Sequence, residues 1–392
     1  MPHPHLRSFS AIAIAALVVS SFSSVLLFPT KARASGCTIT TSETIDASYM
    51  SAHSSCLDGI DISNNVAIVW GVSPLVLNSG ATVVVSGGIN SFKNVLNFDS
   101  ANHNNFTVSN GATVMQVAED FQGVVVLNAD TIDVEGTINV SGGTLNGVTS
   151  GGCQPTSNWT VANMGKGPSG GFSCVVGDAG GAYQDRWMGG AHCGEGGTNG
   201  HDGYPQRNVH TYETSSTAML PGSSGGGWSI EGYDYYGGAG GGVIKLTAAS
   251  ITINGTLTAK GADSPYDGGN GAGGGSGGTI NIDSSGSISG TGHIIVDGGA
   301  GGGWGTGGGA GYIRVYYVDS LSTTLQSNMS ATGGLGAYGS SSQDDGGSCD
   351  PYILQNLSMV PEFTPWILAA TILAGFGLAY KLMPQMKTRT VK

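Results

Sequence analysis

The side chains best suited to metal chemistry gather in one short stretch of the sequence, which contains His192, Cys193, Glu195, His201 and Asp202. Imidazole, thiolate and carboxylate groups all bind zinc, but their spacing here fits no standard zinc pattern. Asp263 and Asp267 could bind Ca²⁺ together with loop carbonyls, although the nonapeptide repeat of calcium-binding β-rolls is absent. The sequence therefore predicts no resident cofactor and leaves these two groups as candidate metal sites.

Catalytic residues are harder to assemble from the sequence. No Ser/His/Asp or Cys/His set stands out. Lys245, Asn281 and Arg314 occupy corresponding outward positions in three successive repeats and could form a basic catalytic ladder. The simpler interpretation, which we favour, is that they line a solvated outer face of stacked strands.

Aromatic rings that could stack on sugars lie in a glycine-rich segment at residues 143–236. The residues singled out as carbohydrate contacts are Trp159, Trp187, Trp228, Tyr233, Tyr235 and Tyr236. Such rings offer apolar area together with a polar group. The alternative, which we slightly prefer, is a small core beneath the loops, held by disulfides.

An internal repeat indicates the elements that must position these residues. Residues 127–142 (LNADTIDVEGTINVSG) align without gaps with residues 246–261 (LTAASITINGTLTAKG). In each unit two short runs of alternating apolar residues flank a Gly-centred turn, which is typical of half-buried strands. Units that cannot bury a face alone must stack. The predicted inward residues are Ile132, Val134, Ile251, Ile253, Ile280 and Ile282.

The repeat predicts an all-β fold, namely a right-handed parallel β-helix, or β-solenoid. An antiparallel β-sandwich is the alternative, because strand–Gly–strand also describes a hairpin. Of 69 Gly, 52 lie between residues 142 and 311, and so much Gly excludes a helical bundle. The segment 143–236 interrupts the repeat and is expected to leave the stack as a Gly-rich, disulfide-containing insertion.

The two ends of the chain read as export and membrane signals. Arg7, an apolar stretch at 11–28 and a small-x-small site at 32–34 are typical of a secretory signal peptide. Residues 363–380 carry no charge and predict one transmembrane helix. Four basic residues follow it, which places the tail in the cytoplasm and the body outside.

Two resemblances follow from these motifs. Pro361, Glu362 and Phe363, followed by the apolar helix and the basic tail, resemble the PEP-CTERM or PEF-CTERM sorting signals of bacteria and archaea. That resemblance implies processing by an exosortase-type enzyme. Residues 273–299 resemble the repeats of large secreted β-solenoid adhesins, which implies a structural or adhesive role.

Charge and cysteine content narrow the choice of partners. Residues 35–362 hold all 26 acids and seven of the bases, so their net charge is −19 (7 − 26). A body this acidic repels phosphate backbones, which excludes nucleic acid as a partner. Cys37 is expected to pair with Cys56. The other cysteines are expected to form two more disulfides of open connectivity: Cys153, Cys174, Cys193 and Cys349.

These observations divide the chain into a signal peptide, N-terminal coils, the insertion, Gly-rich repeats, a cap with linker, and the sorting signal: 1–34, 35–142, 143–236, 237–318, 319–360 and 361–392. The predicted function is that of a non-enzymatic cell-surface or matrix protein, structural or adhesive, with carbohydrate binding as its candidate activity. The alternative is a β-helix polysaccharide lyase or glycoside hydrolase. The predicted location is the cell surface, with the protein either anchored in the membrane or released after C-terminal processing.

Overall fold

The computed structural model describes residues 36–63, 65–116, 124–142, 189–197, 211–212, 219–230, 233–235, 237–264, 271–337 and 345–356. The expected signal peptide, sorting motif and C-terminal helix lie outside these ranges. Within them, no helix has both the length and the apolar character needed to cross a bilayer.

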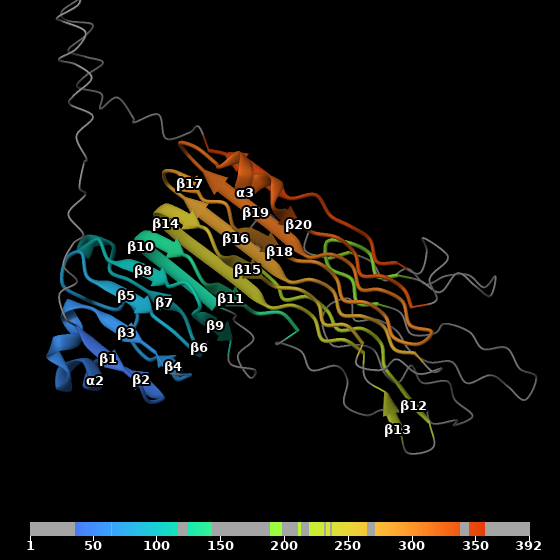
Figure 1. Cartoon of the computed structure of the whole chain (residues 1–392), viewed down its shortest axis with the longest axis horizontal. Coiled ribbons are helices and arrows are strands. Elements are labelled where there is room, and N and C mark those ends of the chain that lie inside the picture. The colour runs from blue at the N-terminus through green and yellow to red at the C-terminus, as the bar shows by residue number, and fades with distance from the viewer. Residues whose placement is uncertain are drawn as a thin grey trace, which may run out of the picture. The chain divides into compact units, whose positions relative to one another are not determined.

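Alternating apolar residues build two parallel sheets (Figure 1). The first sheet has 11 strands and runs in the order β1 (Cys37–Ile39), β3 (Ile60–Ile62), β5 (Thr82–Val85), β8 (Asn105–Val108), β10 (Val124–Val134), β14 (Val243–Ile253), β16 (Thr279–Ser284), β19 (Tyr312–Tyr317) and β21 (Tyr352–Gln355), with β7 (Leu96–Asn97) beside β10 and β17 (Ile288–Ser289) beside β14. The second sheet has eight: β2 (Glu43–Ile45), β4 (Ala67–Trp70), β6 (Ile89–Lys93), β9 (Thr113–Gln116), β11 (Thr137–Asn139), β15 (Thr256–Thr258), β18 (His293–Ile295) and β20 (Met329–Ser330).

The chain passes back and forth between these sheets and moves along both of them as it does so. Every pairing within the two sheets is parallel. The antiparallel sandwich, kept as the alternative, is therefore wrong for these sheets. The described helices are short: α2 (Ala47–Ala52), η2 (Ser54–Asp58), η3 (Ser100–Asn102) and α3 (Thr323–Ser327).

The core lies between the two sheets and follows the register that the repeat predicted. The gapless alignment reappears as strand pairing, with Ile132 opposite Ile251 and Val134 opposite Ile253, although the insertion separates β10 from β14 in sequence. All six predicted inward residues are confirmed as buried, each at most 1% exposed. Apolar side chains from successive strands thus stack into one continuous core.

The N-terminal end of the stack is covered by helices. Asp46 caps α2 by accepting a hydrogen bond from the Tyr49 N–H at 2.7 Å. Tyr49 and Met50 of that helix pack against the end of the core. The expected Cys37–Cys56 disulfide is confirmed and ties β1 to η2.

The glycine-rich segments next to the C-terminal strands form an ordered assembly, which we call the glycine bundle. Its segments are 189–197, 219–227, 237–242, 259–264, 271–278, 296–311, 331–335 and 345–349. In Figure 1 several of them appear as the ribbons without arrows that continue the yellow and orange strands. None belongs to a sheet, yet their backbones are densely hydrogen-bonded to one another.

The hydrogen bonds of segment 273–278 repeat every three residues. Its first three N–H groups donate to three different segments, and the next three donate to the same segments in the same order. The acceptors are the carbonyls of Gly226, Thr306, Ala262, Ser223, Gly309 and Ala259. Three residues per turn without internal hydrogen bonds describes an extended helix of the polyproline-II type, here made mainly of Gly.

Two described parts of the insertion, 189–197 and 219–227, belong to this bundle. The sequence led us to expect an excursion away from the stack, whereas these residues pack directly on the segments that lead into β16 and β19. The physical reason is close approach. A Cβ at Gly277 would overlap the carbonyl oxygen of Val296, so only a backbone without side chains can pack this tightly.

Candidate functional site

The outer face of the first sheet carries two rows of side chains over β14, β16, β19 and β21. The first row is Lys245, Asn281, Arg314 and Tyr352. The second row is Thr247, Asp283, Tyr316 and Leu354. Each row is in register because alternate residues of a strand point to the same side. The corresponding positions proposed for Lys245, Asn281 and Arg314 are therefore confirmed.

The insertion covers part of this face. Thr279 Oγ1 donates to the Leu220 carbonyl at 2.8 Å, and Asn281 Nδ2 lies 3.7 Å from Met219 Sδ. Asn281 is 8% exposed, and Arg314, its neighbour on β19, is 3% exposed. The expectation that both lie on a solvated face is wrong, and at Asn281 the reason is that the segment at 219–220 returns across the strand.

The covered Arg314 still acts on its neighbours electrostatically. Its guanidinium lies 4.5 Å from the centre of the Tyr312 ring, a cation–π distance. Burial raises the pKa of Tyr316; Arg314 opposes that rise, while Tyr352 and Asp283 add to it. The Tyr316 phenol therefore remains a hydrogen-bond donor at neutral pH.

An open group of side chains remains beyond the insertion, and we call it the tyrosine patch: Asp283, Tyr316, Tyr352 and Leu354. The Tyr316 and Tyr352 rings are 6.0 Å apart at an angle of 59°. Tyr352 is 48% exposed and Asp283 is exposed beside them. Two rings and a carboxylate can offer a polyhydroxylated ligand both an apolar surface and hydrogen-bond partners.

The histidine of the proposed metal cluster has a structural role. His192 is fully buried, and its Nδ1–H donates to the Gly277 carbonyl at 2.8 Å. Its ring stacks on Tyr212 at 4.6 Å and meets the edge of Tyr312 at 5.0 Å. The Tyr312 hydroxyl also donates to the Tyr212 carbonyl at 3.1 Å. These contacts fasten the insertion to the bundle and to β19.

Two of the remaining members of that cluster are described, and one of these, Glu195, is exposed. Cys193 forms a disulfide with Cys349, 156 residues away, and so cannot offer a thiolate. His201 and Asp202 lie outside the described residues. Among the described ranges, no three His, Cys, Asp or Glu residues come together as metal ligands.

Other predicted site residues are placed as follows. The carboxylate of Asp263 accepts a hydrogen bond from the Ala300 N–H at 2.7 Å, while Asp267 lies outside the described residues. A hairpin of β12 (Trp228–Ile230) and β13 (Tyr233–Tyr235) sets Trp228 opposite Tyr235. Side chains outside the description are those of Trp159, Trp187, Trp228, Tyr233, Tyr235 and Tyr236, and Cys153 and Cys174 are also outside it.

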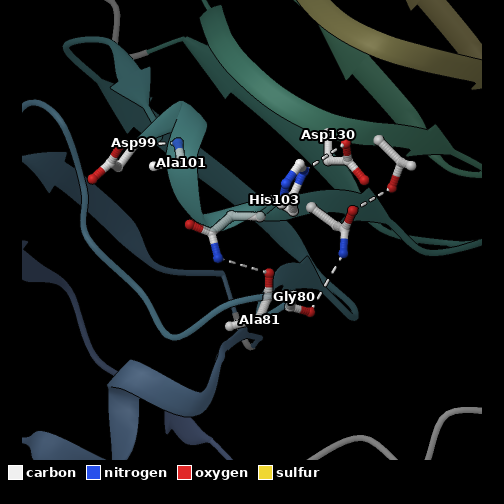
Figure 2. A network of polar contacts seen from close by, with 9 residues as sticks. Gly80, Ala81, Asp99, Ala101, His103 and Asp130 are labelled. Carbon is white, nitrogen blue, oxygen red and sulfur yellow. Dashed lines mark hydrogen bonds and ion pairs between the residues drawn. The ribbon is translucent and has the colours of Figure 1, made fainter.

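A second set of polar side chains connects β8 and β10 and the loops before them in the N-terminal half (Figure 2). His103, with a left-handed backbone (φ 49°), lies 3.3 Å from Asp130 through Nδ1 and Oδ1. Asn104 Nδ2 donates to the Asn78 carbonyl, and Asn105 Oδ1 accepts from the Thr131 hydroxyl. His103 and Asp130 are both well exposed, so the pair is a solvent-facing link between neighbouring turns.

One acidic pair has unusual electrostatics. Burial and, next, the nearby Glu135 carboxylate raise the pKa of Asp133, which lies on the outer face of β10. Glu135 also accepts a hydrogen bond from Asn254 Nδ2 at 2.7 Å, across the boundary that the insertion creates in the sequence. Asp133 is thus held closer to protonation than an ordinary aspartate.

Comparison of the chain with protein-family models, with curated proteins and with solved structures gives no match. The tyrosine patch was missed in the sequence, although part of the signal is there. In the run Tyr312-Ile313-Arg314-Val315-Tyr316 the alternation places both tyrosines and the arginine on one face. Tyr352 could not be added, because its place depends on the pairing of β21 with β19.

Proposed function

We propose that this protein is an exported, non-enzymatic surface or matrix protein that adheres to neutral polysaccharide through the tyrosine patch. The observation that carries the proposal is the pair of neighbouring tyrosine rings beside an exposed carboxylate, all borne by in-register strands. Rigid strands suit a repetitive polymer better than loops do, because the binding groups are held at fixed spacing.

The architecture that we propose for the body is a right-handed β-solenoid. Strands alternate between two parallel sheets and advance along both, so each return to a sheet is a crossover connection between parallel neighbours. Such crossovers are right-handed in about 98% of cases. A long stack of this kind is stiff and would hold a binding face at a distance from the cell surface.

The location follows from the ends of the chain and from the cysteines. Disulfides persist in oxidising compartments, and the two described here support export. The signal peptide, the helix at 363–380 and processing by an exosortase-type enzyme near Pro361, Glu362 and Phe363 are part of the proposal. The protein would then be anchored in the membrane or released after cleavage.

Charge favours a neutral polymer over an acidic one. The body carries a net charge of −19 (7 − 26), and the charged member of the patch is Asp283. The base best placed to attract an anion, Arg314, is almost fully covered. An acidic polysaccharide would therefore be repelled at moderate ionic strength.

A glycoside hydrolase remains the second candidate function, and the observation that favours it is the Asp133–Glu135 pair. Hydrolases use two carboxyl groups of which one has a raised pKa. A lyase finds less support, because Arg314 is only 3% exposed. Release of reducing ends from a polysaccharide panel, lost in Glu135→Gln, would favour the hydrolase.

Binding is tested by co-sedimentation of the full-length protein with insoluble cellulose and chitin, and by calorimetry with their soluble oligosaccharides. Tyr352→Ala should weaken binding about tenfold, equivalent to about 1.4 kcal/mol. Tyr352→Phe, which keeps the ring, should retain most of it. Ile89→Ala removes a side chain of similar exposure from the second sheet and is the matched control. Equal binding by Tyr352→Ala and Ile89→Ala would contradict the proposed site.

A further inference from the structure

The first and last strands of the first sheet differ in which described elements contact them. At the N-terminal end, η2 contacts β1, α2 contacts β2, and Tyr49 and Met50 pack against the last layer of the core. At the other end β21 is the last strand of the described residues, and among them it pairs only with β19. Ile353, which points inward, is only half-buried there.

The strand at this open end has none of the features that normally discourage pairing with another chain. Residues 352–356 read Tyr-Ile-Leu-Gln-Asn, with no charge and no Pro. Tyr352 and Leu354 are 48% and 43% exposed. Natural edge strands usually carry Lys, Pro or a bulge, or are covered by another element. An uncharged edge that no described element covers is suited to accept a further strand.

The direction of the backbone groups shows which residues face the open edge. The Asn356 N–H donates to the Tyr317 carbonyl at 2.7 Å, so it points toward β19. Because backbone groups alternate in direction along a strand, the N–H groups of Ile353 and Gln355 point away from β19. Within the described part of the chain, neither of these two N–H groups has a hydrogen-bond partner.

We propose that β21 pairs antiparallel with β21 of a second copy of this chain, so that the first sheet continues from one subunit into the other. A two-fold axis at Ile353 makes the strand its own complement. Ile353 exchanges two backbone hydrogen bonds with Ile353 of the partner subunit. The Gln355 N–H reaches the carbonyl of Pro351 of the partner subunit, and Pro351, which has no N–H, ends the ladder.

The same register makes the side chains compatible. Outward residues oppose outward residues, so Tyr352 meets Leu354 of the partner subunit. The inward Ile353 meets Ile353 of the partner subunit and closes the open end of the core. Asp350 faces Asn356 of the partner subunit rather than another acid, which matters in so acidic a protein. In this register every side chain opposes a compatible side chain of the partner subunit, and we therefore assign the edge to a second copy of the chain.

The test compares the mass of the full-length protein in mild detergent, by size-exclusion chromatography with light scattering over a dilution series. The wild type should have the protein mass of a dimer. Leu354→Lys should shift it to the monomer and raise the dissociation constant at least tenfold. Ile89→Lys makes the same change at an exposed position on β6, 57% exposed, and should remain dimeric. A wild-type monomer at the highest soluble concentration, or a dimeric Leu354→Lys, would overturn the proposal.

The register is tested with cysteines. Residues 352 and 354 of two copies form a non-hydrogen-bonded pair, whose Cα atoms lie about 4.5 Å apart, within disulfide range. The double variant Tyr352→Cys/Leu354→Cys should therefore form a covalent dimer on non-reducing gels. Each single variant should stay largely uncrosslinked, because it faces no second cysteine. Equal crosslinking of single and double variants would exclude this register.

Discussion

Adding one methyl group inside the glycine bundle should destabilise the protein, and Gly277→Ala is the sharpest case. The new Cβ would overlap the Val296 carbonyl oxygen and approach the Gly311 amide nitrogen at 2.6 Å, so two backbone segments would have to move. Overpacking of this kind costs about 1–3 kcal/mol. The smaller entropy of an unfolded chain containing Ala offsets about 0.4–1 kcal/mol of that cost.

Gly87→Ala is the matched control for this substitution. No atom lies within 4 Å of a Cβ placed at Gly87, and its φ is not in the left-handed region. The same change there should be neutral or stabilise by up to about 1 kcal/mol. The two variants thus differ in sign although their chemistry is identical.

The measurement is thermal unfolding of the purified protein, followed by circular dichroism, with urea unfolding as a second probe. At roughly 2–4 °C per kcal/mol, Gly277→Ala should melt a few degrees below wild type and Gly87→Ala at or slightly above it. If both melt together, the close packing inferred for segment 273–278 is incorrect.

Four further outcomes are expected. Amides 273–278 should be protected in hydrogen exchange as strongly as those of β16, because every one of the six donates to a neighbouring segment; exchange at the rate of an open loop would contradict the bundle. Ile253→Asp should prevent folding, because it buries an unpaired carboxylate, and a protease-resistant variant would count against the inward assignment. Cys193→Ser opens a loop of 156 residues and should lower the free energy of unfolding by about 5 kcal/mol. Cys37→Ser opens a loop of 19 residues and should lower it by roughly 3 kcal/mol. Equal losses in denaturant titrations would show that loop length does not determine the stabilisation. Because the pKa of Asp133 is raised in the folded state, that state binds more protons than the unfolded one above about pH 4. The free energy of unfolding should therefore fall as pH rises through that window. If the urea midpoint of Asp133→Asn depends on pH as that of the wild type does, Asp133 is not the origin of the fall.

The fold could be anticipated where the chemistry is local and periodic. Alternation of apolar residues within a strand gives the inward set around Ile251. The gapless match between residues 127–142 and 246–261 gives the pairing of β10 with β14, because equivalent positions of stacked repeats lie opposite each other. The Cys37–Cys56 disulfide followed from proximity in sequence and was confirmed.

What could not be anticipated depends on contacts between distant segments. Glycine has no side chain to show a pattern, so the three-residue hydrogen-bond period of 273–278 is invisible in the sequence. The covering of Asn281 by residue 219, and the hydrogen bond from His192 to Gly277, required knowing where residues 192–220 return. The expectation of a solvated face was wrong at Asn281 and Arg314, whose burial depends on such distant contacts.

The Cys193–Cys349 disulfide sets a requirement on the order of assembly. Residues 189–197 are synthesised before the segments 271–278 and 305–311 on which they pack, so they have no docking surface when they first emerge. Cys193 must keep a reduced thiol, or change partners, until Cys349 has been synthesised and the later strands have been added. Closing this bond is therefore among the last events of folding, and it marks chains in which residues 345–349 have packed against residues 189–197.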